Sequence, residues 1–281
     1  MTATSPPIQH YENFPVASLL CPPRLRQPIT AIYHFARAAD DLADEGTQSA
    51  EQRLAALAQY RLDLWACAGG GTVSDRWRSI FEPLGVAIGQ FELPVQLLDD
   101  LLNAFCQDVT HTRDGLAYSD AAALLDYCSR SANPVGRLLL HMYGMRDAHL
   151  LHLSDQICSA LQLINFWQDL GGDIARGRYY FCEADLRRFG VQTADILARH
   201  QSPHATLWIA HCVGSARALM CSGSALAKQI PGRAGWELRL VVQGGLRILD
   251  KIENGGYRTL QTRPKITVWD LPWMLWRALW M

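Results

Sequence analysis

The stretch LQLINFWQDLGGD, residues 161–173, predicts a helix with a narrow polar stripe. Its polar residues Gln162, Asn165, Asp169 and Asp173 recur three, four and four positions apart, so they share one helical face. Buried carboxylates are destabilising unless they are paired, hydrogen-bonded or bound to metal, and no basic residue lies beside this stripe. The stretch therefore predicts a ligand-binding face, the alternative being a polar network between core helices.

A second acidic stretch, DDLAD at residues 40–44, ends another predicted helix. Asp40 and Asp44 lie one helical turn apart, and Arg37 upstream can pair with a carboxylate or a phosphate. Taken alone, the stretch is equally typical of a solvated acidic helix end. If both acidic faces point into one core, they form a clamp for a hard cation such as Mg²⁺, shared with a diphosphate.

The rest of the chain predicts helix nearly throughout, in one all-α domain spanning residues 1–281. About half of the residues (49%) are apolar, enough for a sizeable core, and no strand-like alternation appears. Pro28 suits the first turn of the first helix, and Gly69–Gly71 breaks the pattern. The expected helices are residues 28–44, 50–66, 75–88, 94–110, 119–143, 154–173, 205–229 and 236–253.

Composition and missing motifs disfavour several function classes. A net charge of −1 gives no reason to expect nucleic-acid binding. Eight cysteines without a CxxC pair argue against a zinc knuckle and fit a reducing cytoplasm. The sequence contains neither HExxH nor GxGxxG, which disfavours a zinc hydrolase and a nicotinamide-dependent reductase.

The C-terminal segment, residues 268–281, contains four of the nine tryptophans. Trp269, Trp273, Trp276 and Trp280 recur four, three and four positions apart and would share one helical face. Tryptophan favours the membrane interface, but such a stripe is also typical of a helix packed on its own core. Both interpretations stay open; the functional one is peripheral contact with the inner face of the cytoplasmic membrane.

Four motifs, in order along the chain, resemble those of the squalene/phytoene synthase family. They are DDLAD (40–44), DYCSRSANPVG (126–136), NFWQDLGGD (165–173) and GRYYF (177–181). The opening HYENFPVAS (10–18) is most similar to the branch of the family that serves bacterial hopanoid synthesis. The resemblance implies an isoprenoid-synthase-type helical bundle with a central apolar cavity and Mg²⁺ as cofactor. It also implies a reaction on presqualene diphosphate, in which diphosphate leaves, the cyclopropylcarbinyl cation rearranges and water captures it.

By the same resemblance, individual residues match positions of the family's site. The metal-binding set, whose aspartates are also the catalytic candidates, is Asp40, Asp44, Asn165, Asp169 and Asp173. Positions that hold the diphosphate or line its pocket match His10, Asn13, Tyr33, Arg37 and Gln162. Gln168 and Arg178 are further substrate-binding candidates, and Tyr127 matches a cavity tyrosine assigned to catalysis.

The residue types suit this chemistry independently of the family. Mg²⁺ and Arg37 would neutralise the charge of a departing diphosphate. A carbocation needs a dry, aromatic-rich cavity, for which the candidates are Phe35, Tyr127, Phe166 and Trp167.

Two positions depart from the family pattern. Ser129 stands where many phytoene-type synthases have a second tyrosine, and Gly245 lies near where some have a tyrosine on a late helix. The hypothesis is that the lost bulk admits the quenching water, so that Gly245→Tyr should reduce alcohol formation.

Two other functions remain open. One is condensation of two farnesyl or geranylgeranyl diphosphates to presqualene or phytoene diphosphate. The other is a non-catalytic scaffold, which is disfavoured because both acidic motifs are complete. The expected partners are a prenyl diphosphate and enzymes of the same pathway, not nucleic acid.

Overall fold

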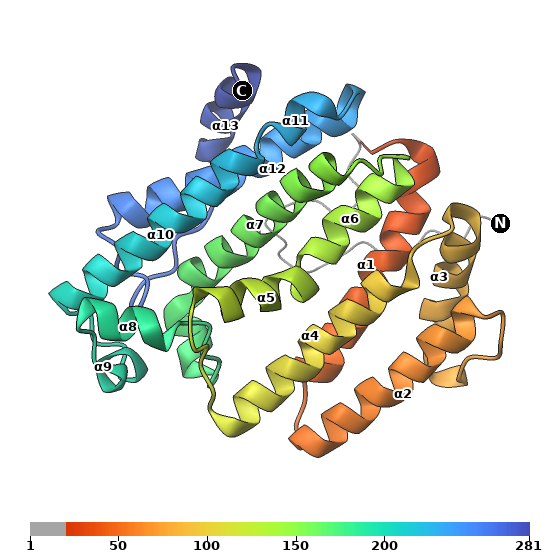
Figure 1. Ribbon diagram of the computed structural model, residues 1–281, viewed down its shortest axis with the longest axis horizontal. Helices are drawn as coiled ribbons and strands as arrows, with labels where there is room; N and C mark the ends of the chain where they lie inside the picture. The colour runs from red at the N-terminus through yellow and green to blue at the C-terminus, as the bar shows by residue number, and fades with distance from the viewer. Residues whose placement is uncertain (1–20) are drawn as a thin grey trace.

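The computed structural model describes residues 21–281, and this part of the chain is almost entirely helical (Figure 1). Its only β pairing is an isolated bridge between Tyr118 and Cys182. The prediction of an all-α helical bundle is confirmed. The single domain and the central apolar cavity stay predictions, and His10 and Asn13 lie outside the described residues.

The first helices form one side of the molecule around their own hydrophobic cluster, which includes Phe35, Tyr60 and Phe81. They are α1 (Pro23–Asp44), α2 (Ala50–Ala68), the short η1 (Asp75–Trp77), α3 (Arg78–Phe91) and α4 (Val95–Asp114). Helix α1 begins five residues earlier than predicted, so Pro28 lies inside it instead of in its first turn. Pro28 removes one backbone N–H from this helix, but it lies on the buried face with Leu25 and Ile32, whose burial stabilises the helix.

The second side is built around α7, which contacts α5, α6, α10 and α12. Its elements are α5 (Ala121–Ser131), α6 (Asn133–Met142), α7 (Ala148–Ala175), α8 (Glu183–Phe189), α9 (Thr193–Leu197), α10 (Pro203–Gly223), α11 (Leu226–Gln229), α12 (Gly232–Asn254), η2 (Val268–Asp270) and α13 (Leu271–Leu279). None of the helices within residues 21–281 combines the length and the apolar character that crossing a membrane requires.

Two predicted helices are each divided in the structure. The span 119–143 forms α5 and α6, with a break at Ala132. Pro134 cannot donate a backbone hydrogen bond and disfavours helical geometry just before it, so a new helix begins there. The span 205–229 forms α10 and α11, separated by a turn at Ser224.

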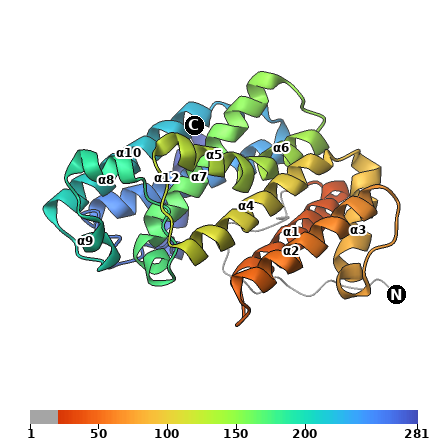
Figure 2. The ribbon, with the colours of Figure 1, turned by 60° about the horizontal axis from the view of Figure 1, so that its bottom comes forward.

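Helices α1, α4 and α7 run in the same direction and end at the same edge of the molecule (Figures 1 and 2). The chain after α12 crosses the last turns of α7. There the Gly171 amide donates to the Thr259 carbonyl over 3.1 Å. A Cβ at residue 171 would lie 2.3 Å from the Leu260 carbonyl oxygen, so this close crossing requires glycine.

Candidate active site

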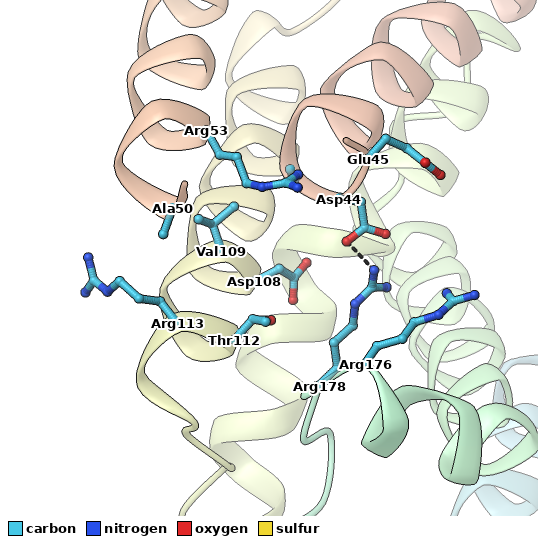
Figure 3. A pocket seen from close by; sticks show the side chains of 11 residues that line it. Asp44, Glu45, Ala50, Arg53, Asp108, Val109, Thr112, Arg113, Arg176 and Arg178 are labelled. Atoms are coloured by element: carbon cyan, nitrogen blue, oxygen red, sulfur yellow. Dashed lines mark ion pairs between the residues drawn. The ribbon is translucent and has the colours of Figure 1, made fainter. Parts of the chain in front are cut away.

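An open pocket of about 570 Å³ lies where the C-terminal ends of α1 and α4 meet the loop after α7 (Figure 3). Its walls are mostly charged, with three carboxyl groups and four arginines among the lining residues. The lining residues are Ala43, Asp44, Glu45, Ala50, Arg53, Asp108, Val109, Thr112, Arg113, Arg176 and Arg178. A pocket lined by both signs of charge suits an anion bound together with a cation.

Arg178 joins the two acidic motifs across this pocket. It follows α7 in a tight turn, where Gly177 adopts a φ of +76° and the Arg178 amide donates to the Asp173 carbonyl over 2.9 Å. Its guanidinium forms an ion pair with Asp44 at the end of α1, drawn as a dashed line in Figure 3. The end of the first motif therefore lies beside the end of the second.

Asp108 is a third acidic element of the pocket, contributed by α4. One of its carboxylate oxygens accepts a hydrogen bond from the Tyr127 hydroxyl over 2.7 Å, and the other accepts one from Tyr180 over 3.0 Å. Burial raises the pKa of Asp108 to about 7, although both tyrosine hydrogen bonds and the charge of Arg178 act to lower it. The carboxyl group therefore titrates near neutral pH.

Aromatic rings form a continuous cluster behind Asp108. Phe166 and Tyr180 stack with centroids 3.9 Å apart and an interplanar angle of 9°. Tyr127 lies against both rings, at 6.1 Å from Phe166 and 5.8 Å from Tyr180. This arrangement places electron-rich ring faces beside the charged pocket.

The second motif has basic partners that lie outside its own helix. Arg263, from the segment that crosses α7, pairs with both carboxylate oxygens of Asp169. The pKa of Asp173 is raised to about 7, first by burial and also by the charge of Asp169, while Arg178 acts to lower it. The stripe has no basic partner beside it in the sequence, and Arg263 is supplied to Asp169 by a segment 94 residues further along the chain.

The first two aspartates of the first motif, by contrast, are paired within α1. Arg37 contacts Asp40 over 2.8 Å and Asp41 over 2.7 Å, one turn along the same helix. Burial, reinforced by the charge of Asp44, raises the pKa of Asp40 to about 6. Asp40 and Asp44 thus repel each other, which is the electrostatic condition that a bound cation relieves.

The donor set suits a hard cation such as Mg²⁺. Asp40 on α1 and Asp173 on α7 are carboxyl groups whose burial disfavours their charged form, and the charge of Asp44, which lines the pocket, acts on both. Within residues 21–281 no three acidic, histidine or cysteine side chains converge into a ready metal cluster. Arginines neutralise Asp40, Asp44 and Asp169 instead, in the positions where a cation would act.

The remaining candidate residues differ in their surroundings. On the face of α7 that carries the second motif, Asn165 is exposed and Gln162 is half-buried. Gln168 is buried and donates to the Pro264 carbonyl over 2.7 Å, so its amide holds the crossing segment. Tyr33 is half-buried on α1, with its ring 5.7 Å from that of His34.

Two of the four cavity aromatics named from sequence lie away from this cluster. Phe35 is fully buried and packs with Tyr60 and Phe81 in the α1–α4 core. Trp167 packs edge-on against Trp208. Tyr127 and Phe166 are the two that lie together beside Asp108.

The two positions that depart from the family pattern have different surroundings. A Cβ at residue 245 would meet Met220 at 2.9 Å and Ile164 at 3.2 Å, so apolar side chains already fill this volume. Ser129 is exposed and donates to the Asp126 carbonyl over 2.6 Å. The hypothesis that lost bulk at residue 245 admits water is therefore wrong. Gly245→Tyr should mainly destabilise the core.

Several site residues were missed in the sequence. Asp108 could have been recognised from the sequence. It lies one turn after Ala104 and two turns after Leu101 on α4, and it is the one carboxylate on that face of the helix. Tyr180 lies within the GRYYF motif, but its bond to Asp108 spans 72 residues. Arg263 gave no local signal, since its partner lies 94 residues away.

Comparison with known proteins identifies the family. The family profile "Squalene/phytoene synthase" matches residues 8–270. The chain belongs to this family. It is similar to the hydroxysqualene synthase of Zymomonas mobilis, with 37% identity over 73% of this chain and 65% of that protein. The hydroxysqualene synthase of Rhodopseudomonas palustris is 32% identical over 91% of this chain and 82% of that protein.

A solved structure agrees with this assignment. The squalene synthase HpnC from Alicyclobacillus acidocaldarius is 38% identical, with a TM-score of 0.79 over 88% of this chain and 90% of that chain. Relatives named presqualene diphosphate synthase and phytoene synthase also match, at 30–31% identity. Membership in a family of enzymes that process prenyl diphosphates is shown, and it does not by itself distinguish among their reactions.

Proposed function

We propose that this protein is a hydroxysqualene synthase. It would ionise presqualene diphosphate, rearrange the cyclopropylcarbinyl cation and capture it with water, releasing hydroxysqualene and diphosphate as a carbon–oxygen lyase. The observation that carries the proposal is a charged pocket at which Asp44, the end of the first acidic motif, pairs with Arg178, which follows the second motif. Asp108 of the same pocket is hydrogen-bonded to the aromatic cluster. The choice of reaction is supported by relatives of that name at 32–37% identity.

Binding of the leaving diphosphate is assigned to the charged pocket. Asp40, Asp44, Asn165, Asp169 and Asp173 would hold Mg²⁺, which when bound supplies positive charge to the departing phosphate oxygens. Arg37 and Arg178 would exchange their carboxylate partners for phosphate oxygens, because a guanidinium binds either in the same forked geometry. His10, Asn13, Tyr33 and Gln162 complete the proposed diphosphate site.

The cation is assigned to the aromatic side of the pocket. Tyr127, Phe166 and Tyr180 present rings that stabilise positive charge. Asp108 orients both tyrosine hydroxyls toward itself, which fixes the rings at the boundary between charged pocket and apolar core. The water would attack from the polar side of this boundary.

A product assay tests the proposal. The purified protein is given presqualene diphosphate with Mg²⁺ and no nicotinamide, and in parallel farnesyl diphosphate, with products identified by mass spectrometry. Hydroxysqualene from presqualene diphosphate alone is the expected result. Running the reaction in ¹⁸O-labelled water should place the label in the alcohol, and an unlabelled alcohol would contradict water capture.

Head-to-head condensation of two prenyl diphosphates is the second candidate. Its support is the set of relatives named presqualene diphosphate synthase and phytoene synthase. Turnover of farnesyl diphosphate to presqualene diphosphate in the same assay would establish it in place of the first.

The proposal also places the enzyme in its cellular setting. The substrate and product are long apolar molecules that reside in membranes. We therefore infer a cytoplasmic enzyme at the inner face of the cytoplasmic membrane, receiving substrate from enzymes of the same hopanoid and squalene pathway.

A further inference from the structure

The C-terminal helix α13 exposes almost its entire apolar surface. Met274 and Ala278 are its buried residues, and they face α12. At about 100° per residue, the opposite side of the helix is the tryptophan face, consisting of Trp273, Trp276 and Trp280. These side chains are 44%, 54% and 79% exposed, and Trp269 just before the helix is 87% exposed.

Both open interpretations of the tryptophan stripe thus receive an answer. The helix does pack on the protein's own core, through Met274 and Ala278. Trp276 and Trp280 line an open pocket with Val242 and Leu246 of α12, yet both stay more than half exposed. Leu275 and Leu279, between the two faces, are also exposed, at 52% and 62%. A helix that is apolar nearly all round is normally covered on all sides, and this one is covered on one side only.

The segment that carries α13 is held firmly in place. Asp270 is buried at the start of the helix and pairs with Arg247 and Lys251 of α12. It also accepts hydrogen bonds from the Thr267 amide and hydroxyl, over 2.7 Å and 2.9 Å. The tryptophan face is therefore presented by an anchored helix at the edge of the molecule (Figure 1).

The part of the chain that carries this face is rich in positive charge. Residues 226–281 contain nine lysines and arginines against four acidic residues, whereas residues 1–225 contain 17 against 23. Arg277 of α13 lies 5.9 Å from the Trp273 ring, and Arg239 of α12 lies 4.9 Å from the exposed Trp236. Tryptophan and arginine together match the interfacial zone of an anionic bilayer.

The size of the face favours lipid over a second copy of the chain. A nine-residue helix is about 14 Å long and about 10 Å wide. Such a strip is far smaller than the roughly 800 Å² that each partner of a stable complex buries. Membrane binding requires no minimum contact area, because each apolar side chain that enters the interface adds to the binding free energy.

We propose that the tryptophan face of α13, together with Arg239 and Arg277, binds the surface of a membrane containing anionic lipids. The helix lies in the plane of the interface, with its three tryptophans and two leucines among the headgroups. Its anchored attachment to α12 then fixes the orientation of the whole enzyme on the membrane.

Co-sedimentation of the full chain with vesicles tests the proposal. Wild-type protein should bind vesicles of phosphatidylglycerol mixed with phosphatidylcholine, and bind pure phosphatidylcholine less. The variant Trp273→Gln/Trp276→Gln/Trp280→Gln should bind at least about tenfold more weakly while melting at an unchanged temperature, because these side chains are exposed. Arg277→Gln should weaken binding about fivefold, to the anionic vesicles only.

A matched control removes equally exposed apolar residues elsewhere. Leu62, Trp65 and Val86 are 64%, 46% and 67% exposed on α2 and α3, and replacing all three by Gln should leave binding unchanged. Equal loss in both triple variants, or a wild-type protein that binds neither vesicle, would overturn the proposal. So would a wild-type dimer that the tryptophan variant converts to monomer, since the face would then belong to a second copy. Vesicle binding needs no substrate, so the result is independent of the proposed reaction.

Discussion

The two acidic motifs differ in where their positive partners come from. In the first, Arg37 lies on the same helix as Asp40 and Asp41, one turn away. In the second, Asp169 is paired by Arg263, which lies 94 residues further along the chain. Asp40 and Asp41 of the first motif are therefore paired within a single helix, whereas Asp44 of that motif and Asp169 of the second are paired by distant parts of the chain. The difference indicates that the start of the first motif is balanced locally, whereas its end at Asp44 and the second motif depend on tertiary structure for their charge balance.

The largest expected effect comes from removing one carboxylate of either motif. Asp173→Asn should lower the rate of diphosphate release from presqualene diphosphate at least about 100-fold, because charge stabilisation of the leaving group is lost. Asp40→Asn should do the same, although its motif is locally paired. Asp41→Asn is the matched control, since Asp41 also pairs with Arg37 but is outside the proposed metal set. A loss as large in the control would remove the distinction between the two aspartates.

Asp108 differs from the aspartates of both motifs, because its hydrogen bonds come from two tyrosines and not from an arginine. Its pKa of about 7 lies above the ordinary value of about 3.9, so the folded state holds this proton more tightly than the unfolded state. Its contribution to stability is full below pH 4 and is lost as the pH rises to about 7. In chelator, the free energy of unfolding of Asp108→Asn should fall less over this range than that of wild type.

The expected difference between the two curves is a few kcal/mol, at about 1.4 kcal/mol per pKa unit. Denaturant titrations at a series of pH values measure it. Parallel curves for wild type and variant would show that the pKa of Asp108 is the same in the folded and unfolded states and that the argument from its burial is wrong.

Removing the arginine partner of each motif should have a smaller effect, on stability, and it compares the two motifs directly. Arg263→Gln should destabilise the metal-free protein by about 1 kcal/mol, and Arg37→Gln by less. The reason is that Asp169 is 20% exposed and Asp40 is 38% exposed, so the former is costlier to leave unpaired. Thermal melts in chelator measure both variants. Added Mg²⁺ should restore Arg263→Gln more than Arg37→Gln, and equal restoration would contradict the proposed difference.

The smallest expected effect is a shift in pH dependence. Tyr127→Phe removes one of the two hydrogen bonds that lower the pKa of Asp108, so this pKa should rise. A net hydrogen bond is worth about 1 kcal/mol, which corresponds to somewhat less than one pKa unit. The acid limb of the pH–rate profile should move upward by that amount, with Tyr118→Phe as the control that leaves Asp108 bonded. An acid limb at the same pH in Tyr127→Phe and wild type would show that Asp108 is not the group whose titration the pH–rate profile reports.

The sequence predicted those features of the structure that depend on residues close together in the chain. The spacing of Asp169 and Asp173 predicted their shared face, since α7 is unbroken from residue 148 to 175. The break at Pro134 could have been predicted from its missing N–H, but the apolar periodicity on both sides concealed it. Arg263, Tyr180 and the crossing at Gly171 could not be predicted, because each depends on a contact between segments far apart in the chain. The filled space at Gly245 could not be predicted for the same reason, since its neighbours Met220, Ile164 and Leu161 come from two other helices, α10 and α7.

The central claim is that both motifs act on one ligand through shared cations. The most direct test is a double-mutant cycle of Asp40→Asn and Asp173→Asn, read as the affinity for inorganic diphosphate in the presence of Mg²⁺ by calorimetry. If the motifs act together, the double variant should bind little worse than the weaker single variant. Losses that multiply, or diphosphate binding that does not require Mg²⁺, would contradict the claim and show that the two motifs act independently.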